Sequence, residues 1–401
     1  MKISDKLFNL LNPSKYAKDS DSVIIACYYN PQRNPYRLKA FREFYNSVKH
    51  MDILITECVL EGTEPELIHE FPDIRINRVW TKNLLWHKEA LLNNIIQVLP
   101  SNYKYVFWVD ADVIFDNRNW LVEATEELRS GANLVQPFKY CVHLERDELR
   151  PSFDYIKESV YTKNLGLRNP KMWYSFGYAH TIGISNSHNY ETHGHVGFAW
   201  GARVEVVKEV PLYDKALVGG ADHIIAHAAT DYLPHSCIEK SFTEDIDTIN
   251  DWSFKFFKAV KGKVSYATGT LFHIWHGDIK NREYFKRVKE FTPLSKTITK
   301  KDKNGLYISE NNEEDYVKRY FNKREAIPTT PSFINDAEFA SNVMVDVITD
   351  VIITNENVDI QPEQSLEFGG GEFGGGGAGG SWETPVENNN PSFDDSNNTF
   401  S

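Results

Sequence analysis

Two acidic residues directly follow an apolar run in the segment YKYVFWVDADVIFD (103–116). Asp110 and Asp112 are separated by one residue, so in an extended or bulged chain both carboxylates can approach one divalent cation. Oxygen ligands suit Mn²⁺ or Mg²⁺, and such an ion can bridge a diphosphate. The alternative is that both side chains are solvated at the start of a loop, because this short motif also occurs by chance.

The elements around these two residues predict an α/β protein with a mostly parallel sheet. Apolar runs bounded by turn residues predict strands, and segments with helical spacing alternate with them. Ligands of such sheets bind beyond the carboxyl ends of the strands, which is where Asp110 and Asp112 lie. We expect strands at 22–29, 52–60, 103–109 and 133–138, and helices at 35–50, 83–100 and 118–131.

The second half of the chain is less regular. Residues 140–200 are rich in Tyr, Asn, Gly and His, which is typical of long loops over a site. The apolar segment 343–353 is either a late strand or a partner segment. Further helices are expected at 202–210, 222–229, 252–262, 281–291 and 312–325, and a strand with its exit at 264–277.

Composition divides the chain into four parts. We expect a lead-in (1–21), a catalytic domain (22–300), an appendage (301–360) and a disordered tail (361–401), because the Gly-rich tail cannot bury enough apolar surface to fold. The tail carries seven acidic residues and no Lys or Arg, so it accounts for much of the net charge of −12. The remaining charge of about −5 argues against a broad nucleic-acid-binding face.

The 401 residues are 41% hydrophobic and 25% charged, as in a soluble globular protein. The four cysteines are far apart and form no CxxC pair, which predicts reduced thiols and fits a cytoplasmic protein. The N-terminus lacks the apolar core of a secretory signal. No apolar stretch is long enough to span a membrane.

The motif YVFWVDADVIF (105–115), after SVIIACYYN (22–30), resembles the nucleotide-sugar-binding half of a GT-A-fold glycosyltransferase, similar to glycosyltransferase family 2. The resemblance covers about 22–290. It implies a GT-A fold, a nucleotide-diphosphate sugar as donor and Mn²⁺ or Mg²⁺ as cofactor. It further implies that Asp110 contacts the ribose and the metal, and that Asp112 ligates the metal. The nucleobase would lie against Tyr28, Tyr29 and Asn30.

A second block, HVGFAWGARVEVV (195–207) and LYDKALVGGADHIIAHA (212–228), is similar to the acceptor side of the same family. The turn VGGADH resembles the family's GxGED turn, although Ala221 stands where an acidic residue is common. The resemblance implies that Asp222 is the catalytic base that deprotonates an acceptor hydroxyl. Its position also allows a purely structural role, in which Asp222 is the N-cap of the following helix. Glu191, Asp214 and Asp245 are the other candidates for a base.

Three further residues complete the expected site. The resemblance implies a late histidine as the remaining metal ligand, and His276 in LFHIWHGD (271–278) is the first choice, with His273 as the alternative. Arg282 has the forked geometry that binds phosphate oxygens, or it faces solvent on a helix. Lys88 lies beside the apolar face of its helix, where a lysine usually extends to solvent. In GT-A enzymes the equivalent helix can lend a charged residue to the donor.

The sequence leaves rival functions open. A nucleotidyltransferase of similar fold would need a Gly-rich basic loop after the first strand, and CYYNPQRNPYR (27–37) contains no glycine. A sugar-binding protein without catalysis would not need the acidic motif, Asp222 and a late histidine together. A glycan or polysaccharide is the expected acceptor. A modified DNA base is the alternative, because a run of basic residues is near the proposed site: Lys280, Arg282, Lys286, Arg287, Lys289, Lys296, Lys300, Lys301 and Lys303.

Overall fold

The computed structural model describes residues 16–72, 74, 76–146, 148, 172–185, 193–231, 236–242, 245–309 and 313–324. The chain divides into two compact units, Met1–Asp346 and Val347–Ser401. All described residues belong to the first unit. The apolar segment 343–353 and the tail 361–401 lie outside the described residues, and the four-part division of the chain stays a prediction.

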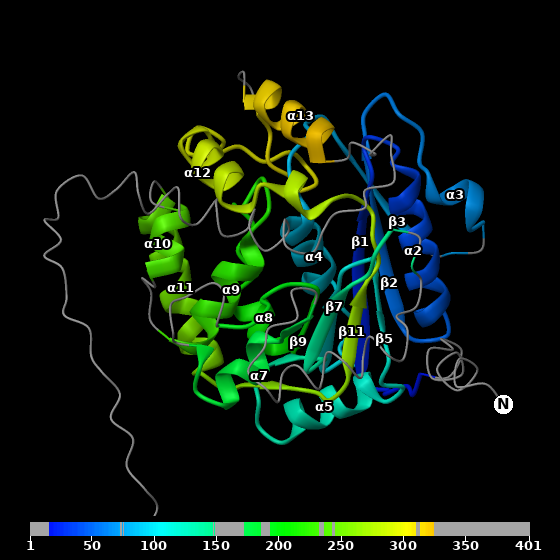
Figure 1. Ribbon diagram of the computed structural model, residues 1–401, viewed down its shortest axis with the longest axis vertical. Helices are drawn as coiled ribbons and strands as arrows, with labels where there is room; N and C mark the ends of the chain where they lie inside the picture. Colours follow the sequence, from blue (N-terminus) through cyan, green and yellow to red (C-terminus); the bar gives the residue numbers. More distant parts are fainter. Residues whose placement is uncertain are drawn as a thin grey trace, which may run out of the picture. The chain divides into compact units, whose positions relative to one another are not determined.

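A seven-stranded sheet forms the centre of the first unit (Figure 1). Neighbouring strands are parallel except at β9, which is antiparallel to both β4 and β6. The predicted α/β fold with a mostly parallel sheet is therefore confirmed. From edge to edge the strands are β10 (Val264–Tyr266), β6 (Leu134–Gln136), β9 (Ala199–Arg203), β4 (Tyr105–Val109), β1 (Ser22–Tyr29), β2 (Ile53–Leu60) and β3 (Ile76–Thr81).

Side chains of β1 alternate between two hydrophobic cores, one on each face of the sheet. Val23 and Ile25 belong to one core, and Ile24 and Ala26 belong to the other. All four are fully buried. A strand covered on both faces has a continuous apolar sequence, which is why β1 was predictable from its composition.

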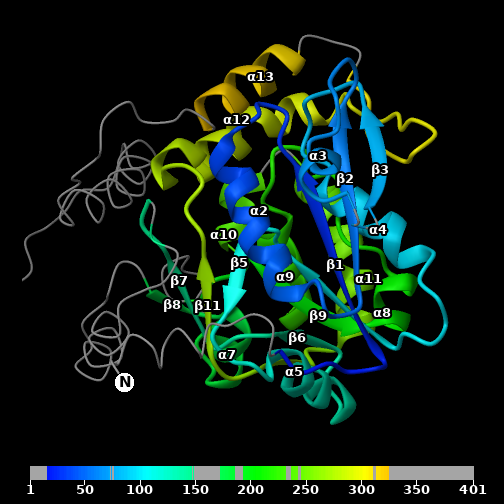
Figure 2. The same ribbon diagram turned by 90° about the vertical axis from the view of Figure 1, so that its right-hand side faces the viewer.

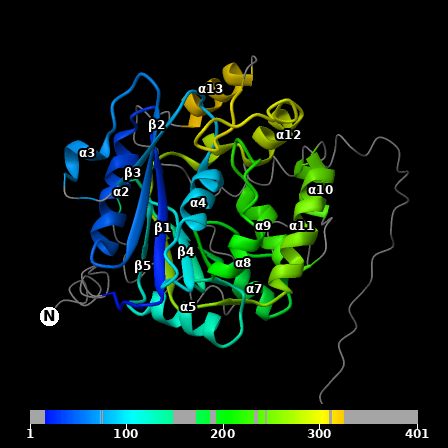
Figure 3. The same cartoon turned by 180° about the vertical axis from the view of Figure 1, so that it is seen from behind.

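Helices cover both faces (Figures 2 and 3). One core lies under α2 and α5, and the opposite core lies under α4, α8, α9, α10 and α11. The helices of the first face are α2 (Pro35–Val48) and α5 (Trp120–Arg129); those of the second are α4 (Lys88–Gln97), α8 (Val204–Glu209), α9 (Ala221–Thr230), α10 (Ser236–Phe242) and α11 (Ile246–Val260). Two short helices, α3 (Leu67–Glu70) and α7 (Phe176–Thr181), lie in connections.

A second, four-stranded sheet contains the chain that leaves the acidic motif. Its strands, in spatial order, are β5 (Val113–Phe115), β11 (Thr270–His273), β7 (Tyr140–His143) and β8 (Met172–Tyr174). Val113 pairs with His273, and the Ile274 amide donates to the Asp112 carbonyl at 2.8 Å. The sheet therefore brings the late histidines to the acidic motif. It also corrects two predictions: residues 264–277 form two strands in different sheets, and 140–200 is not only loops.

The helix predicted over 83–100 begins only at Lys88. Ahead of it, the Trp86 amide donates to the Leu217 carbonyl at 2.8 Å. The side chain of Asn83 hydrogen-bonds the backbone of Ser309 in both directions, at 3.1 and 3.2 Å. These long-range contacts hold residues 83–87 in a non-helical path, so the predicted start was wrong and Lys88 is the first residue of α4.

The helix predicted over 202–210 was wrong in its first part, which belongs to β9. Gly201 of this strand packs against the ring of Phe107 in β4. A Cβ atom at position 201 would lie 2.3 Å from Phe107 Cε1, which leaves no room for a side chain. The close approach allows β9 to fill the space between β4 and β6, and the helical spacing continues only in α8.

The last described helices, α12 (Tyr284–Ser295) and α13 (Glu313–Arg324), follow the short 3₁₀ turn η4 (Ile279–Arg282). Val317, Tyr320 and Phe321 of α13 share a hydrophobic cluster with Leu84 and Leu217. The start of the predicted appendage thus packs on the domain above α4 and α9 (Figure 1). Among the described residues, no helix is long and apolar enough to cross a membrane.

Candidate active site

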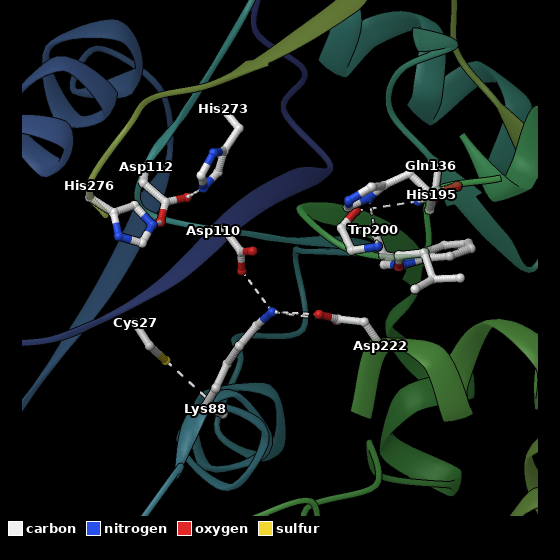
Figure 4. A network of polar contacts seen from close by, with 12 residues as sticks. Cys27, Lys88, Asp110, Asp112, Gln136, His195, Trp200, Asp222, His273 and His276 are labelled. Atoms are coloured by element: carbon white, nitrogen blue, oxygen red, sulfur yellow. Dashed lines mark hydrogen bonds and ion pairs between the residues drawn. The ribbon is translucent and has the colours of Figure 1, made fainter. Parts of the chain in front are cut away.

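The acidic motif lies at the carboxyl end of β4, facing the first turns of α4 and α9 (Figure 4). Lys88 Nζ stands between two carboxylates, 2.7 Å from Asp110 Oδ1 and 3.2 Å from Asp222 Oδ2. Burial disfavours the charge of the lysine, but the two carboxylates outweigh it and hold the pKa of Lys88 well above its usual value. Lys88 is therefore a charged bridge inside the site and does not extend to solvent.

Asp112 turns the other way, toward two histidines (Figure 4). Asp112 Oδ2 lies 3.1 Å from His276 Nε2, and Asp112 Oδ1 lies 3.9 Å from His273 Nε2. One ligand atom from each of the three residues falls within 4.8 Å of the others. We call these three residues the acid–imidazole group. His276, the first choice of the sequence analysis, lies nearer to the carboxylate than His273, and its role as a metal ligand stays a prediction.

The acid–imidazole group fits a divalent cation. Burial, followed by the charge of Arg282, lowers the pKa of His273 well below its usual range, so this imidazole keeps the lone pair that a metal requires. Burial raises the pKa of Asp112, while Arg37 and Arg282 oppose the rise. A mixed carboxylate and imidazole set suits Mn²⁺ better than Mg²⁺, which prefers oxygen ligands and water.

Asp110 stands apart from the acid–imidazole group, because one of its oxygens is engaged by Lys88. Burial raises the pKa of Asp110, and the nearby Lys88 charge counteracts that shift. The two acids of the motif therefore face different partners, one the lysine and the other the histidines. The predicted role of Asp110 as a metal ligand stays a prediction.

The carboxylate of Asp222 is not an N-cap. The cap position of α9 is Gly220, whose φ of 106° is in the left-handed region, and Asp222 lies in the first helical turn. Its carboxylate instead accepts from Lys88 Nζ. A Cβ atom at Gly197 would lie 3.5 Å from Asp222 Oδ2, so this glycine leaves space beside the carboxylate. The N-cap interpretation was wrong, and Asp222 belongs to the polar site.

Three buried arginines lie on the side of the site covered by α12 and α13. Arg282 Nη2 lies 3.0 Å from His276 Nε2 and 3.3 Å from His273 Nε2. Arg287 and Arg324 both hydrogen-bond the hydroxyl of Tyr320. Burial alone would raise the pKa of Tyr320, but the two arginines outweigh it and lower that pKa. Arg282 is thus inside the site, as one of the two sequence interpretations expected, and does not lie on a solvated helix face.

Tyr28 and Asn30, predicted to contact the nucleobase, hold the loop that follows β1. Tyr28 donates to Glu66 Oε2 at 2.5 Å, and Asn30 Nδ2 donates to the same oxygen at 2.9 Å. Asn34, at the end of this loop, donates to the His276 carbonyl at 3.0 Å. Tyr29 packs near Phe321, with ring centroids 6.0 Å apart. The loop therefore supports the His276 segment, and its contact with a nucleobase stays a prediction.

The other candidate bases lie away from these contacts or outside the described residues. Asp214 is paired with Lys301 at 2.6 Å and accepts from Tyr307 at 3.2 Å. Asp245 accepts from the hydroxyl of Tyr213 at 2.7 Å. Glu191 lies outside the part of the chain that the structure describes.

Two features of the site were missed by the sequence analysis. Arg324 lies in the predicted appendage, and the apolar spacing of α13 was the signal that this segment packs on the domain. Glu89, next to Lys88, is buried, and burial raises its pKa to about 8 against the opposing charge of Lys88. Nothing in the sequence distinguished this glutamate from a solvated one.

Solved structures show similar folds at low sequence identity. Glucosyl-3-phosphoglycerate synthase from Mycobacterium tuberculosis is 9% identical, with a TM-score of 0.34 over 72% of this chain and 82% of its own. A complex of that enzyme with Mn²⁺, UDP-glucose and phosphoglyceric acid is 10% identical, with a TM-score of 0.34 over 73% and 85%. TarS from S. aureus is 8% identical, with a TM-score of 0.32 over 77% and 44%. No protein-family model and no curated protein matches the chain.

Proposed function

We propose that this chain is a metal-dependent glycosyltransferase that transfers a sugar from a nucleotide-diphosphate sugar to an acceptor hydroxyl. The observation that carries the proposal is the bridge of Lys88 between Asp110 and Asp222. It joins the acidic motif to the candidate base, while Asp112 is joined to the late histidines. Residues from four distant segments thus form one polar site at the end of the parallel sheet, where ligands of such sheets bind.

The donor diphosphate is proposed to lie between the acid–imidazole group and the buried arginines. Asp110, Asp112 and His276 are the proposed metal ligands, with His273 as a further donor. A bound Mn²⁺ would neutralise the leaving diphosphate. Arg282, which contacts both histidines, is placed to donate to phosphate oxygens through its forked guanidinium.

Asp222 is proposed to accept the proton of the acceptor hydroxyl. As that proton leaves, the acceptor oxygen bonds the anomeric carbon and the bond from that carbon to the diphosphate oxygen breaks. Burial raises the pKa of Asp222, which suits a group that accepts a proton, and the charge of Lys88 opposes that rise and holds the carboxylate in one orientation. Direct attack of this kind would invert the anomeric configuration.

The acceptor is proposed to be a hydroxyl of a glycan or polysaccharide. The basic run that suggested DNA is partly neutralised in the structure. Lys286 lies 3.8 Å from Glu283 and 3.9 Å from Glu290, and Lys301 is paired with Asp214. Arg282 and Arg287 of the same run are buried. These pairings and the burial of the two arginines reduce the cationic surface that the run offers to a phosphate backbone, which supports a glycan over DNA as the proposed acceptor.

Donor hydrolysis tests the proposal without knowledge of the acceptor. The purified chain is incubated with Mn²⁺ and a panel of nucleotide-diphosphate sugars, and the nucleotide and sugar products are identified. Release of nucleoside diphosphate and free sugar, lost in Asp112→Asn, is the expected result. In a parallel incubation with a nucleoside triphosphate and a sugar phosphate, release of pyrophosphate would favour the nucleotidyltransferase. Donor binding without hydrolysis of any donor would favour a sugar-binding protein.

A further inference from the structure

A second group of three side chains with metal-ligand chemistry lies outside the proposed active site. His223 and His227 are one turn apart on α9, and His193 reaches them from the segment before β9. One ring nitrogen from each histidine falls within 4.8 Å of the others. The ring centroids are 5.2 Å (His193–His223), 4.8 Å (His193–His227) and 5.0 Å (His223–His227) apart. We call these residues the three-histidine group.

We infer that the three-histidine group is a binding site for a zinc-type divalent cation. Three imidazoles supply nitrogen ligands, and no carboxylate belongs to the group, a set that suits Zn²⁺ and disfavours Mg²⁺ and Ca²⁺. In a tetrahedral site with Zn–N bonds of about 2.0–2.1 Å, the ligand nitrogens are about 3.4 Å apart. The ligand nitrogens lie within 4.8 Å of one another, so metal binding would draw the rings closer together, and a water molecule would complete the coordination.

The orientation of His193 is that of a metal ligand with an outer-shell partner. Its Nδ1 lies 2.8 Å from the carbonyl oxygen of Gly194, and because a carbonyl only accepts, Nδ1 must carry the proton. The neutral ring then presents the lone pair of Nε2. Ligating histidines commonly donate their other ring N–H to a backbone carbonyl in this way, which fixes both the tautomer and the ring plane.

The backbone around His193 is held in place independently of any metal. Gly194 has a φ of 85°, and a Cβ atom there would lie 2.7 Å from the Ser175 carbonyl oxygen and 2.9 Å from Phe176 Cα. The Phe176 amide donates to the His195 carbonyl at 3.0 Å. The ring of Phe176 contacts both His193 and His227, with centroids 5.8 and 5.2 Å away. The site is therefore buried, preformed and partly apolar, as structural metal sites are.

Such a cation would link two segments that flank the candidate base. His223 directly follows Asp222 on α9, and four residues after His193 the chain reaches Gly197, which faces the Asp222 carboxylate. Zinc would thus join α9 to the segment 193–198 and fix the position of both. This is a structural role, and it does not depend on the proposed transferase activity.

The test uses the full chain, stripped with a strong chelator, reloaded with Zn²⁺ alone and desalted. Bound metal per chain and the melting temperature are measured for three variants. His223→Gln/His227→Gln should lose one equivalent of zinc and the zinc-dependent rise in melting temperature. Asp112→Asn/His276→Gln should keep that equivalent, which separates this site from the acid–imidazole group. His180→Gln, a control histidine bound to Ser185 and the Gly262 carbonyl, should behave as wild type.

Two results would overturn the inference: a wild-type chain that retains no zinc after desalting, or a double histidine variant that retains as much as wild type. If the double variant does not fold, the wild-type chain is loaded with Co²⁺ instead. A nitrogen-ligated four-coordinate site then gives an intense visible absorption that His193→Gln should remove. Absence of that absorption in the wild-type chain would also reject the site.

At a zinc concentration 100-fold above Kd, the unfolding equilibrium constant should fall about 100-fold.

Discussion

The acid–imidazole group and the three-histidine group are built on the same principle but differ in their surroundings. Each takes two histidines that are close in sequence and a third residue from elsewhere. In the first group the histidines are three residues apart, at the end of β11 and just after it, and in the second they are four apart on α9. Asp112 and Arg282 accompany the first pair, whereas a third imidazole and the Phe176 ring accompany the second. Charged neighbours of both signs suit an ion that contacts a charged substrate. An apolar, all-imidazole shell suits an ion that stays in place.

This difference has a consequence for variants of the two groups. Loss of a ligand in the acid–imidazole group should change turnover and leave the fold intact, because the three side chains lie at or near the ends of strands and belong to none of the hydrophobic cores. Loss of a ligand in the three-histidine group should change stability and metal content. A ligand variant of the acid–imidazole group that lost stability, or one of the three-histidine group that lost only turnover, would contradict this distinction.

The largest expected effect is that of Asp112→Asn. The substitution keeps the shape of the side chain but removes the charged ligand, so Mn²⁺-dependent donor turnover should fall below detection. The melting temperature without metal should change little. Turnover is measured as nucleoside diphosphate released, with Asp247→Asn, an exposed acid of α11, as the control. Full turnover of Asp112→Asn in buffer treated with EDTA would contradict the proposed metal site.

Asp222→Asn should have the next largest effect, because base catalysis is typically worth about 10²–10⁴-fold. Transfer to an acceptor should fall by that factor while donor affinity is preserved. Asparagine is also tolerated in the first turn of a helix, so stability should change little. The comparison uses steady-state transfer and donor titration, with Glu205→Gln in the first turn of α8 as control. Transfer at the wild-type rate would show that another group removes the proton.

These two predictions depend on different parts of the site, and only one of these parts could be predicted from the sequence. The strand 105–109 and the acids after it were predictable, because a buried strand has a continuous apolar sequence and ligands gather at its carboxyl end. The bridge from Lys88 to Asp222 was not predictable, since it joins residues 134 positions apart. The start of α4 at Lys88 depends on contacts of Asn83 with Ser309, which no local pattern contains.

The sequence indicates two of the three ligands of the three-histidine group. The four-residue spacing of His223 and His227 within a predicted helix places both rings on one face. The third ligand was not visible, because His193 lies in a segment without periodicity and reaches α9 only through the fold. Local spacing can therefore suggest a pair of ligands, but long-range packing decides whether the pair becomes a site.

The pH dependence of the free energy of unfolding also contains a contribution from a buried histidine outside both groups. Burial lowers the pKa of His87 to about 4, so the folded chain disfavours its protonation. The unfolded chain takes up this proton near pH 6.5, so the free energy of unfolding should be greatest above that pH. It should fall by about 3 kcal/mol as the pH drops toward 4. His87→Gln should flatten this slope in urea unfolding, whereas His69→Gln, an exposed control, should not.

The slope that remains in His87→Gln contains the contribution of the two groups together with that of other buried histidines, such as His143 and His195, whose pKa values burial also lowers. If metal binding to the three-histidine group adds stability, adding Zn²⁺ should steepen the remaining slope, because protons compete for the imidazoles. Zinc that changes the slope equally in His223→Gln/His227→Gln would contradict a role for this group.

The smallest expected effect is that of Lys88→Met on stability. Methionine keeps most of the packed stem but leaves Asp110 and Asp222 facing each other without the cation between them. Breaking a fully buried ion pair costs about 3–5 kcal/mol, but these carboxylates keep 26% and 23% of their exposure, so water compensates part of the loss. We expect the free energy of unfolding to fall by about 1–2 kcal/mol at pH 7. Lys82→Met, at an exposed position, is the matched control.

In an Asp222→Asn background the cost of Lys88→Met should shrink, because a neutral amide does not repel Asp110, and a double-mutant cycle measures this coupling. Equal costs in both backgrounds would show that Lys88 acts through packing, and the charged bridge would no longer join the acidic motif to α9.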